Sequence, residues 1–190
     1  MKKGRIIVLN GVSSSGKTTL VRELQKKLSE TYYWLANDTF VNMLPFKCWG
    51  DDPSEYMSHA LIMLNKVIKI FSDDEKNVIV DQVMQTTDRS DIFKDLVIRL
   101  HGYPVLLVNV VCPIPELERR EKERGDRNIG QAVSQLSLLN PQDGYDIVVD
   151  TFNKSISDCA DEIIEMLNSS NNAALAKFYN QFIGIEYEAH

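Results

Sequence analysis

One octapeptide, Gly11 to Thr18, constrains this chain more than any other stretch. It reads GVSSSGKT and fits the pattern G-x-x-x-x-G-K-[ST] at every fixed position. The apolar run before it, residues 5–9, has the length and branching of a buried parallel strand. Leucines recur at four-residue spacing over residues 20–28, on one face of a helix. A strand, a glycine-containing loop and a helix are the context that this phosphate-binding motif needs.

The two glycines and the lysine indicate how the loop works. Gly11 and Gly16 let the backbone turn sharply and approach a polyphosphate without a β-carbon in the way. Amide N–H groups of the loop and of the helix start then converge on phosphate oxygens. We expect Lys17 to reach the β- and γ-phosphates and the Thr18 hydroxyl to bind Mg²⁺. The predicted residues for binding ATP follow one another along the chain: Gly11, Val12, Ser13, Ser14, Ser15, Gly16, Lys17, Thr18 and Thr19.

Composition excludes several partners. The 190 residues, 44% apolar and 25% charged, suit one soluble domain. A net charge of −6 argues against nucleic acid and anionic membranes, because both would repel it. The three cysteines lie far apart without metal-ligand spacing, which favours reduced thiols. No apolar stretch reaches the length of a signal peptide or membrane span. We therefore expect a cytoplasmic protein with no nucleic-acid or membrane partner.

The acid after the second predicted strand has two interpretations. Residues 32–36 form an aromatic-rich strand candidate, and Asp38 stands two residues past its end. Asp38 suits the N-cap of a short helix over residues 40–44. Residues just past the carboxyl end of a strand in a doubly wound sheet also face the ligand crevice. There Asp38 would act on an acceptor hydroxyl, either by accepting its proton or by aligning it.

A second acid follows the same rule. The predicted third strand, residues 77–81, ends in Asp81. Many strands end in aspartate, but beside a phosphate loop this pattern is typical of the residue that holds the Mg²⁺ shell. Thr18 and Asp81 are therefore the predicted metal ligands. With further strands over residues 104–111 and 146–150, five strands alternate with helices. This alternation predicts an α/β fold of three layers around a parallel sheet.

A long helix is predicted over residues 53–72. The segment that leads into it, residues 43–59, carries three large aromatic side chains among polar residues. In the folded chain it would hang over the ligand crevice. We expect it to shape an acceptor pocket with Phe46, Trp49 and Tyr56.

Residues 119–127, RREKERGDR, concentrate five basic side chains in an acidic protein. One interpretation is a solvated helix with ion pairs between residues four apart. The other is a helical lid over residues 119–130, approximately, which moves about Gly125 and brings guanidinium groups onto the transferring phosphate. We favour the lid. The predicted catalytic residues are then Lys17, Asp38, Arg120, Arg124 and Arg127.

Three stretches of the sequence narrow the choice among families of small kinases with a phosphate loop. They are residues 6–17, residues 119–127, and residues 145–151 followed by Ser155 and Cys159. Together they resemble the chloramphenicol 3-O-phosphotransferase family, relatives of shikimate and adenylate kinases. The resemblance reaches Leu167. It implies a P-loop kinase domain over residues 1–168 with strand order 2-3-1-4-5, and a link to antibiotic resistance. It also implies ATP-dependent phosphorylation of a small-molecule hydroxyl, with chloramphenicol as a candidate acceptor, a catalytic Asp38, and lid arginines Arg124 and Arg127.

Two questions stay open at this point. Residues 169–190 form a predicted helical extension that either packs on the domain or mediates a homodimer. Other functions also remain: a nucleoside or nucleotide kinase, for which no base-selecting motif is visible, and a nucleotide-dependent switch. For guanine, a switch needs N-K-x-D, but residues 153–156 read NKSI. We predict a kinase, because a lid that shields phosphate from water prevents futile hydrolysis.

Overall fold

The computed structural model describes residues 2–50, 52–86, 90–125, 130–136, 139, 144–169 and 172–188, with side chains described as far as residue 183. Five parallel strands form one sheet in the order β2-β3-β1-β4-β5. The strands are β1 (Ile6–Asn10), β2 (Tyr32–Ala36), β3 (Asn77–Gln82), β4 (Val105–Val111) and β5 (Ile147–Asp150). Both the parallel sheet and the strand order predicted from the family resemblance are confirmed.

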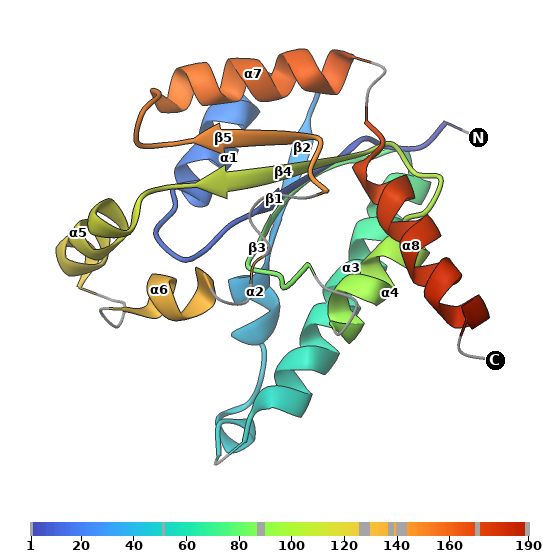
Figure 1. The fold of residues 1–190 in the computed structure, drawn as a ribbon, viewed down its shortest axis with the longest axis horizontal. Coiled ribbons are helices and arrows are strands. Elements are labelled where there is room, and N and C mark those ends of the chain that lie inside the picture. The colour runs from blue at the N-terminus through green and yellow to red at the C-terminus, as the bar shows by residue number, and fades with distance from the viewer. Residues whose placement is uncertain are drawn as a thin grey trace.

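Helices cover both faces of the sheet because the central strands are apolar on both faces. In β1, Ile6 and Val8 face one side, Ile7 and Leu9 face the other, and all four are fully buried. The first pair packs against α3 (Ser54–Asp73), α4 (Asp91–Arg99) and α8 (Ala174–Glu188). The second pair packs against α1 (Lys17–Lys27) and α7 (Ile156–Asn168). Figure 1 shows the resulting three layers.

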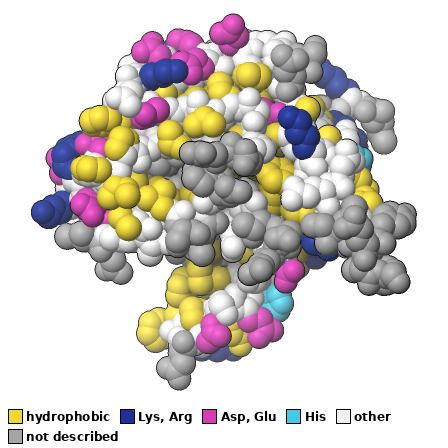
Figure 2. Space-filling model, viewed as in Figure 1, with side chains coloured by type: hydrophobic (Ala, Val, Ile, Leu, Met, Phe, Trp, Pro, Cys, Tyr) yellow, Lys and Arg dark blue, Asp and Glu magenta, His cyan; other side chains and the backbone are white. Residues whose placement is uncertain are grey.

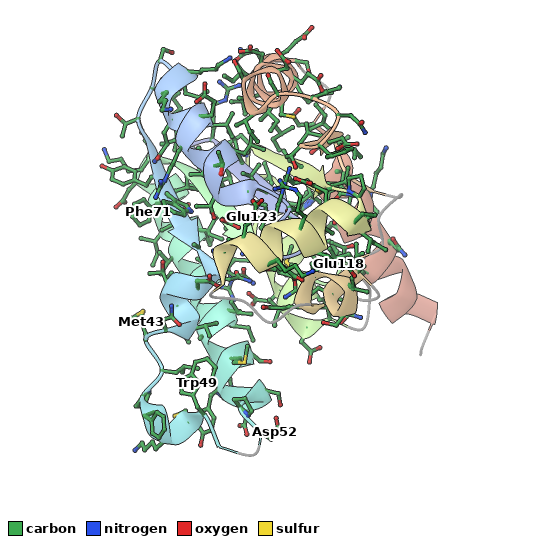
Figure 3. The ribbon with its side chains drawn as sticks, turned by 90° about the vertical axis from the view of Figure 1, so that its left-hand side faces the viewer. Met43, Trp49, Asp52, Phe71, Glu118 and Glu123 are labelled. Carbon is green, nitrogen blue, oxygen red and sulfur yellow. The ribbon has the colours of Figure 1, made fainter. Side chains whose placement is uncertain are left out.

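Two groups of short elements extend beyond these layers. Helices α5 (Ile114–Arg124) and α6 (Gln131–Leu136) follow the carboxyl end of β4. Helix α2 (Asn37–Val41), the 3₁₀ helix η1 (Phe46–Cys48) and the start of α3 lead into a projection that Figure 1 shows below the body. We call residues 42–50 and 52–59 the arm. Figure 2 shows hydrophobic side chains gathered on this projection, and Figure 3 places Trp49 and Asp52 near its tip.

Helix α8 packs on its own domain. Phe178 and Phe182 are 8% and 4% exposed. Their rings meet Phe93 of α4 edge-on, with centroids 4.8 and 5.7 Å away. At Gly144, a β-carbon would lie 2.2 Å from the Phe178 ring, so only glycine fits beneath it. The described aromatic side chains of α8 are therefore part of the core on the α3–α4 side of the sheet.

Phe178→Ala tests this docking. We expect the free energy of unfolding to fall by about 3–5 kcal/mol, because the change removes a buried ring and leaves a cavity. Urea denaturation followed by circular dichroism measures the change. Phe46→Ala is the matched control, since the Phe46 side chain is 93% exposed. A loss below about 1 kcal/mol for Phe178→Ala would contradict the docked position of α8.

Among the described residues, no helix combines the length and apolar composition that a membrane span requires.

Candidate active site

The loop between β1 and α1 holds its shape through its two glycines. A β-carbon at Gly11 would lie 2.4 Å from the Val110 carbonyl oxygen, so the backbone of β4 excludes any larger residue. Gly16 has φ of +98°, a left-handed conformation that favours glycine. From the sequence, both glycines were explained by the close approach of the backbone to a phosphate. At Gly11, the immediate steric constraint is instead the neighbouring strand.

The loop also presents unused polar groups. The Ser14 and Ser15 hydroxyl oxygens are buried and have no hydrogen-bond partner among the described residues. The N-cap residue of α1 is Gly16, which has no side chain. No N-cap side chain therefore accepts a hydrogen bond from the amide N–H groups at the start of that helix. Buried hydroxyls beside a helix N-terminus suit the oxygens of a phosphate group. The loop therefore fits the polyphosphate that its sequence predicts.

Lys17, Thr18 and Asp81 meet beside the loop. The Lys17 ammonium donates to the Val12 carbonyl oxygen at 2.9 Å and lies 3.7 Å from Asp81 Oδ1. The Thr18 hydroxyl donates to Asp81 Oδ2 at 3.0 Å. The parallel pairing of β1 with β3 sets Asp81 opposite Leu9 and so produces this meeting. A hydroxyl and a carboxylate are oxygen ligands of the kind that Mg²⁺ takes together with substrate phosphates, so this pair fits the predicted metal.

Asp38 lies in the first turn of α2. That helix begins at Asn37, and its N-cap is Ala36, which makes no side-chain hydrogen bond. The capping interpretation, in which Asp38 precedes a helix over residues 40–44, is therefore wrong. Asp38 instead lines a cleft of about 670 Å³ that Lys17 and Asp81 also line. The position past the end of β2 brings it to the ligand crevice, as the strand-end argument predicts.

Arg120 reaches the phosphate loop from α5. Its guanidinium donates to the Ser14 carbonyl at 3.2 Å, and to the Thr151 hydroxyl and carbonyl at 3.1 Å each. The Thr151 hydroxyl donates in turn to the Ser15 carbonyl at 2.7 Å. Arg124, one turn further along α5, lines the same cleft. Arg127, the third predicted lid arginine, lies outside the described residues.

The two interpretations of the basic segment each hold for part of α5. Arg119 is half exposed and forms ion pairs with Glu116 and Glu123, as a solvated helix predicts. Figure 3 labels Glu118 and Glu123 on this helix, and Glu123 also lines the cleft. Arg120 lies on the other face and donates to Glu116 Oε1 at 2.7 Å. Hydrogen bonds from Arg119 and then Arg120 lower the pKa of Glu116 to about 2.

Glu116→Gln tests the contribution of this carboxylate. Because the pKa of Glu116 in the folded protein lies below its ordinary value of 4.5, its contribution to stability is present above pH 4.5 and is lost as the pH falls toward 2. We expect the urea midpoint of the variant to lie below that of the parent chain at pH 7. The two midpoints should converge as the pH falls below 4. A difference that stays constant down to pH 3 would contradict the lowered pKa.

Helix α6 contributes two contacts that sequence reasoning missed. The Ser13 amide donates to Gln135 Oε1 at 2.7 Å. The buried Glu121 carboxylate accepts from the amides of Gly130 at 2.8 Å and Ala132 at 2.7 Å. Neither residue belongs to a motif. The only signal in the sequence is the helical spacing of Glu121 from Leu117, which places an acid beside an apolar residue on the buried face of α5.

A smaller cavity of about 190 Å³ adjoins the cleft and shares Asn37 and Val83 with it. The amide oxygens of Asn37 and Gln82 are buried in its wall without a hydrogen-bond partner among the described residues. Leu61, Met84 and Ile92 add apolar side chains to the wall, and Gln85 and Ser90 add polar ones. The aromatic residues expected to shape an acceptor pocket do not take part. Phe46, Trp49 and Tyr56 line neither cavity and lie exposed on the arm, because η1 and the start of α3 project away from the sheet.

The chain is similar in sequence to known proteins. Residues 4–168 match the sequence model of a family described as chloramphenicol phosphotransferase-like protein. A Mycobacterium tuberculosis protein of strain H37Rv, named "Putative O-phosphotransferase", is 27% identical over 189 residues, covering 87% of this chain and 83% of that protein.

Solved structures share the fold. An APS kinase of M. tuberculosis, in complex with AMPPNP and APS, superposes with a TM-score of 0.65 at 20% identity, over 89% of this chain and 100% of that one. A shikimate kinase of Acinetobacter baumannii, in complex with shikimate, gives a TM-score of 0.60 at 12% identity, over 86% and 93%. At these identities the likeness concerns the fold, which is that of the P-loop kinases.

Proposed function

This chain belongs to the chloramphenicol phosphotransferase-like family, and from that premise we propose that it transfers the γ-phosphate of ATP to a hydroxyl group of a small molecule, with Mg²⁺. The observation that carries the proposal is the convergence of Lys17, Asp38 and Asp81 on one cleft beside the phosphate loop. We place the activity in the cytoplasm, where ATP is present and the three free cysteines would stay reduced.

The cleft supplies what phosphoryl transfer needs, which is positioning and neutralisation of charge. The loop and the start of α1 bind the polyphosphate. Lys17 places its ammonium on the phosphate oxygens, and Arg120 and Arg124 add positive charge from α5. Thr18 and Asp81 would hold Mg²⁺, which when bound neutralises negative charge on the phosphate oxygens. No covalent intermediate with the protein is required.

Asp38 is the residue that we assign to the acceptor. In the transfer, the acceptor oxygen forms a bond to phosphorus while the bond from phosphorus to the oxygen of the leaving ADP breaks. The hydroxyl proton passes to the Asp38 carboxylate, or is aligned by it and lost later. The exposed position of Asp38 on the cleft gives an incoming hydroxyl direct access to it.

The smaller cavity is the proposed place for the body of the acceptor. It opens from the cleft at Asn37, the residue before Asp38. The unpaired amide oxygens of Asn37 and Gln82 would each accept a hydrogen bond from a hydroxyl or amide of the acceptor. Chloramphenicol or a related compound is the first acceptor to test, because it gives the family its name, and with it a role in antibiotic resistance.

The test is transfer of labelled γ-phosphate from Mg-ATP to chloramphenicol, beside a panel of amino sugars, shikimate-like alcohols and nucleosides. We expect label in an acceptor of this panel, and loss of labelling in Lys17→Ala and Asp38→Ala. Label only in nucleosides would favour the alternative of a nucleoside kinase. Absence of transfer, combined with ATP hydrolysis that a protein stimulates, would overturn the proposal in favour of a nucleotide-dependent switch.

A further inference from the structure

Three consecutive residues of the phosphate loop contact the α5–α6 pair. The Val12 side chain, 2% exposed, packs in a small apolar core with Leu117 of α5 and Ala132 of α6. The next amide, that of Ser13, donates to Gln135 of α6, and the Ser14 carbonyl accepts from Arg120 of α5. Residues 12, 13 and 14 of the loop are thus held, in that order, by apolar packing, by a hydrogen-bond acceptor on α6 and by a hydrogen-bond donor on α5.

The α5–α6 pair is itself braced by a buried carboxylate. Glu121 is 1% exposed and accepts from two amides at the start of α6, those of Gly130 and Ala132. An ionised carboxylate that accepts two backbone N–H groups makes strong hydrogen bonds at low solvent exposure. The position of Gln135, one turn further along α6, therefore depends on α5. The hydrogen bond between Ser13 and Gln135 therefore depends on the position of both helices relative to the loop.

The chemistry of Gln135 suits a group that stays in place beside a polyphosphate. The Ser13 N–H can only donate, so the atom that it meets must be the side-chain oxygen. The NH₂ group of the same side chain remains a donor of two hydrogen bonds. Gln135 also lines the cleft together with Lys17 and Asp38. A neutral side chain at this position adds no negative charge next to phosphate.

We infer that Gln135 is a positioning residue. Its hydrogen bond to Ser13 fixes the position of the α5–α6 pair relative to the phosphate loop, and this favours phosphate transfer over hydrolysis. The inference rests on the proposed function. Through Ser13 the Gln135 side chain fixes the loop and Arg120 in one arrangement, which aligns the transferring phosphate with the acceptor hydroxyl better than with water. The cleft of about 670 Å³ exists with this contact formed, so the contact does not close the site.

Two substitutions separate the hydrogen bond from the charge. Gln135→Ala removes the acceptor of Ser13. Gln135→Glu keeps an oxygen acceptor but places a negative charge near the phosphate. Val133→Ala, an exposed position on the same helix, is the control. Hydrogen exchange at the Ser13 amide, followed by NMR in the absence of nucleotide, tests the contact independently of any activity. ATP binding, ATP hydrolysis and transfer to the acceptor then test the role.

We expect Ser13 exchange to become about fivefold faster in Gln135→Ala and to stay slow in Gln135→Glu, as loss of one neutral hydrogen bond implies. In Gln135→Ala the ratio of hydrolysis to transfer should rise about fivefold or more, with little change in the KM for ATP. In Gln135→Glu the KM for ATP should rise about fivefold through repulsion. Val133→Ala should match the parent chain throughout.

Tighter nucleotide binding or faster transfer in Gln135→Ala would overturn the inference, because the side chain would then be an obstacle to phosphate. Unchanged exchange at Ser13 with an unchanged partition between hydrolysis and transfer would also overturn it. If the parent chain transfers phosphate to no acceptor, the proposed function fails. The exchange, binding and hydrolysis measurements still decide then whether Gln135 positions the loop.

Discussion

Lys17→Met is expected to lower the rate of phosphate transfer at saturating ATP by about 10³- to 10⁵-fold, the range that a cation on the transferring phosphate supplies in this chemistry. The Lys17 side chain is 7% exposed, and its ammonium is held between the Val12 carbonyl and Asp81. That geometry delivers one desolvated positive charge to the phosphate end of the cleft. Methionine keeps the length and the apolar part of the side chain, so the change acts on charge.

The measurement is kcat for labelled phosphate transfer, with urea denaturation run alongside to confirm folding. Lys26→Met is the matched control, since Lys26 lies on the same helix with its side chain 73% exposed. We expect Lys26→Met to retain full activity. Lys17→Met with more than about a tenth of the parent activity would show that this lysine does not carry phosphate charge in the transfer, and the role assigned to it in the cleft would be wrong.

Local patterns in the sequence predicted most of the fold. The five strands each consist of apolar or branched residues between turn-forming residues, and they lie within one or two residues of the expected positions. The strand order came from the family resemblance, because order depends on crossover connections that no local pattern encodes. The packing position of α8 could not be predicted from the sequence for a similar reason. Its aromatic face would suit a partner chain equally well, and only the position of Phe93 on α4 shows where it packs.

The candidate site divides in the same way. Lys17 and Thr18 follow from a contiguous motif, and Asp81 from a strand end beside it, so they could be predicted. Thr151 and Gln135 could not. Thr151 follows β5 at the far edge of the sheet, and Gln135 lies on a six-residue helix. Both reach the loop only because β5 and the α5–α6 pair pack beside it, at sequence distances of 136 and 122 residues from their partners.

The acceptor side was the least predictable from sequence. Large aromatic residues over a crevice suggested a binding pocket, but the arm carries them away from the sheet. The cavity beside Asp38 is formed instead by polar and aliphatic residues from α2, α3, β3, α4 and the segment between β3 and α4. These residue types are common in cores, so their pattern in the sequence indicates packing. What distinguishes this cavity from an ordinary interior is that the amide oxygens of Asn37 and Gln82 have no hydrogen-bond partner among the described residues.

Asp38→Asn is expected to lower kcat for transfer by about 10²- to 10⁴-fold, the usual contribution of a positioned proton acceptor. The amide has the shape of the carboxylate and can still accept a hydrogen bond, but it cannot take a proton at neutral pH. The KM for ATP should change by less than about threefold, because Asp38 comes from α2 and is not part of the loop that binds the phosphates. Asp161→Asn, an exposed position on α7, is the control.

Acceptors of graded hydroxyl acidity then separate the two roles of Asp38. If the carboxylate takes the proton during transfer, a more acidic hydroxyl needs less help, and the loss caused by Asp38→Asn should shrink as acidity rises. If Asp38 only aligns the hydroxyl, the loss should be small for every acceptor in the series, since asparagine supplies a similar acceptor at a similar place, and Asp38→Ala should then lower kcat much more than Asp38→Asn. A loss below about threefold for every acceptor in Asp38→Asn would contradict the role as proton acceptor, and a loss as small in Asp38→Ala would contradict both roles. In that second case the acceptor hydroxyl would meet the γ-phosphate elsewhere in the cleft, and the first turn of α2 would shape the crevice without touching the reaction.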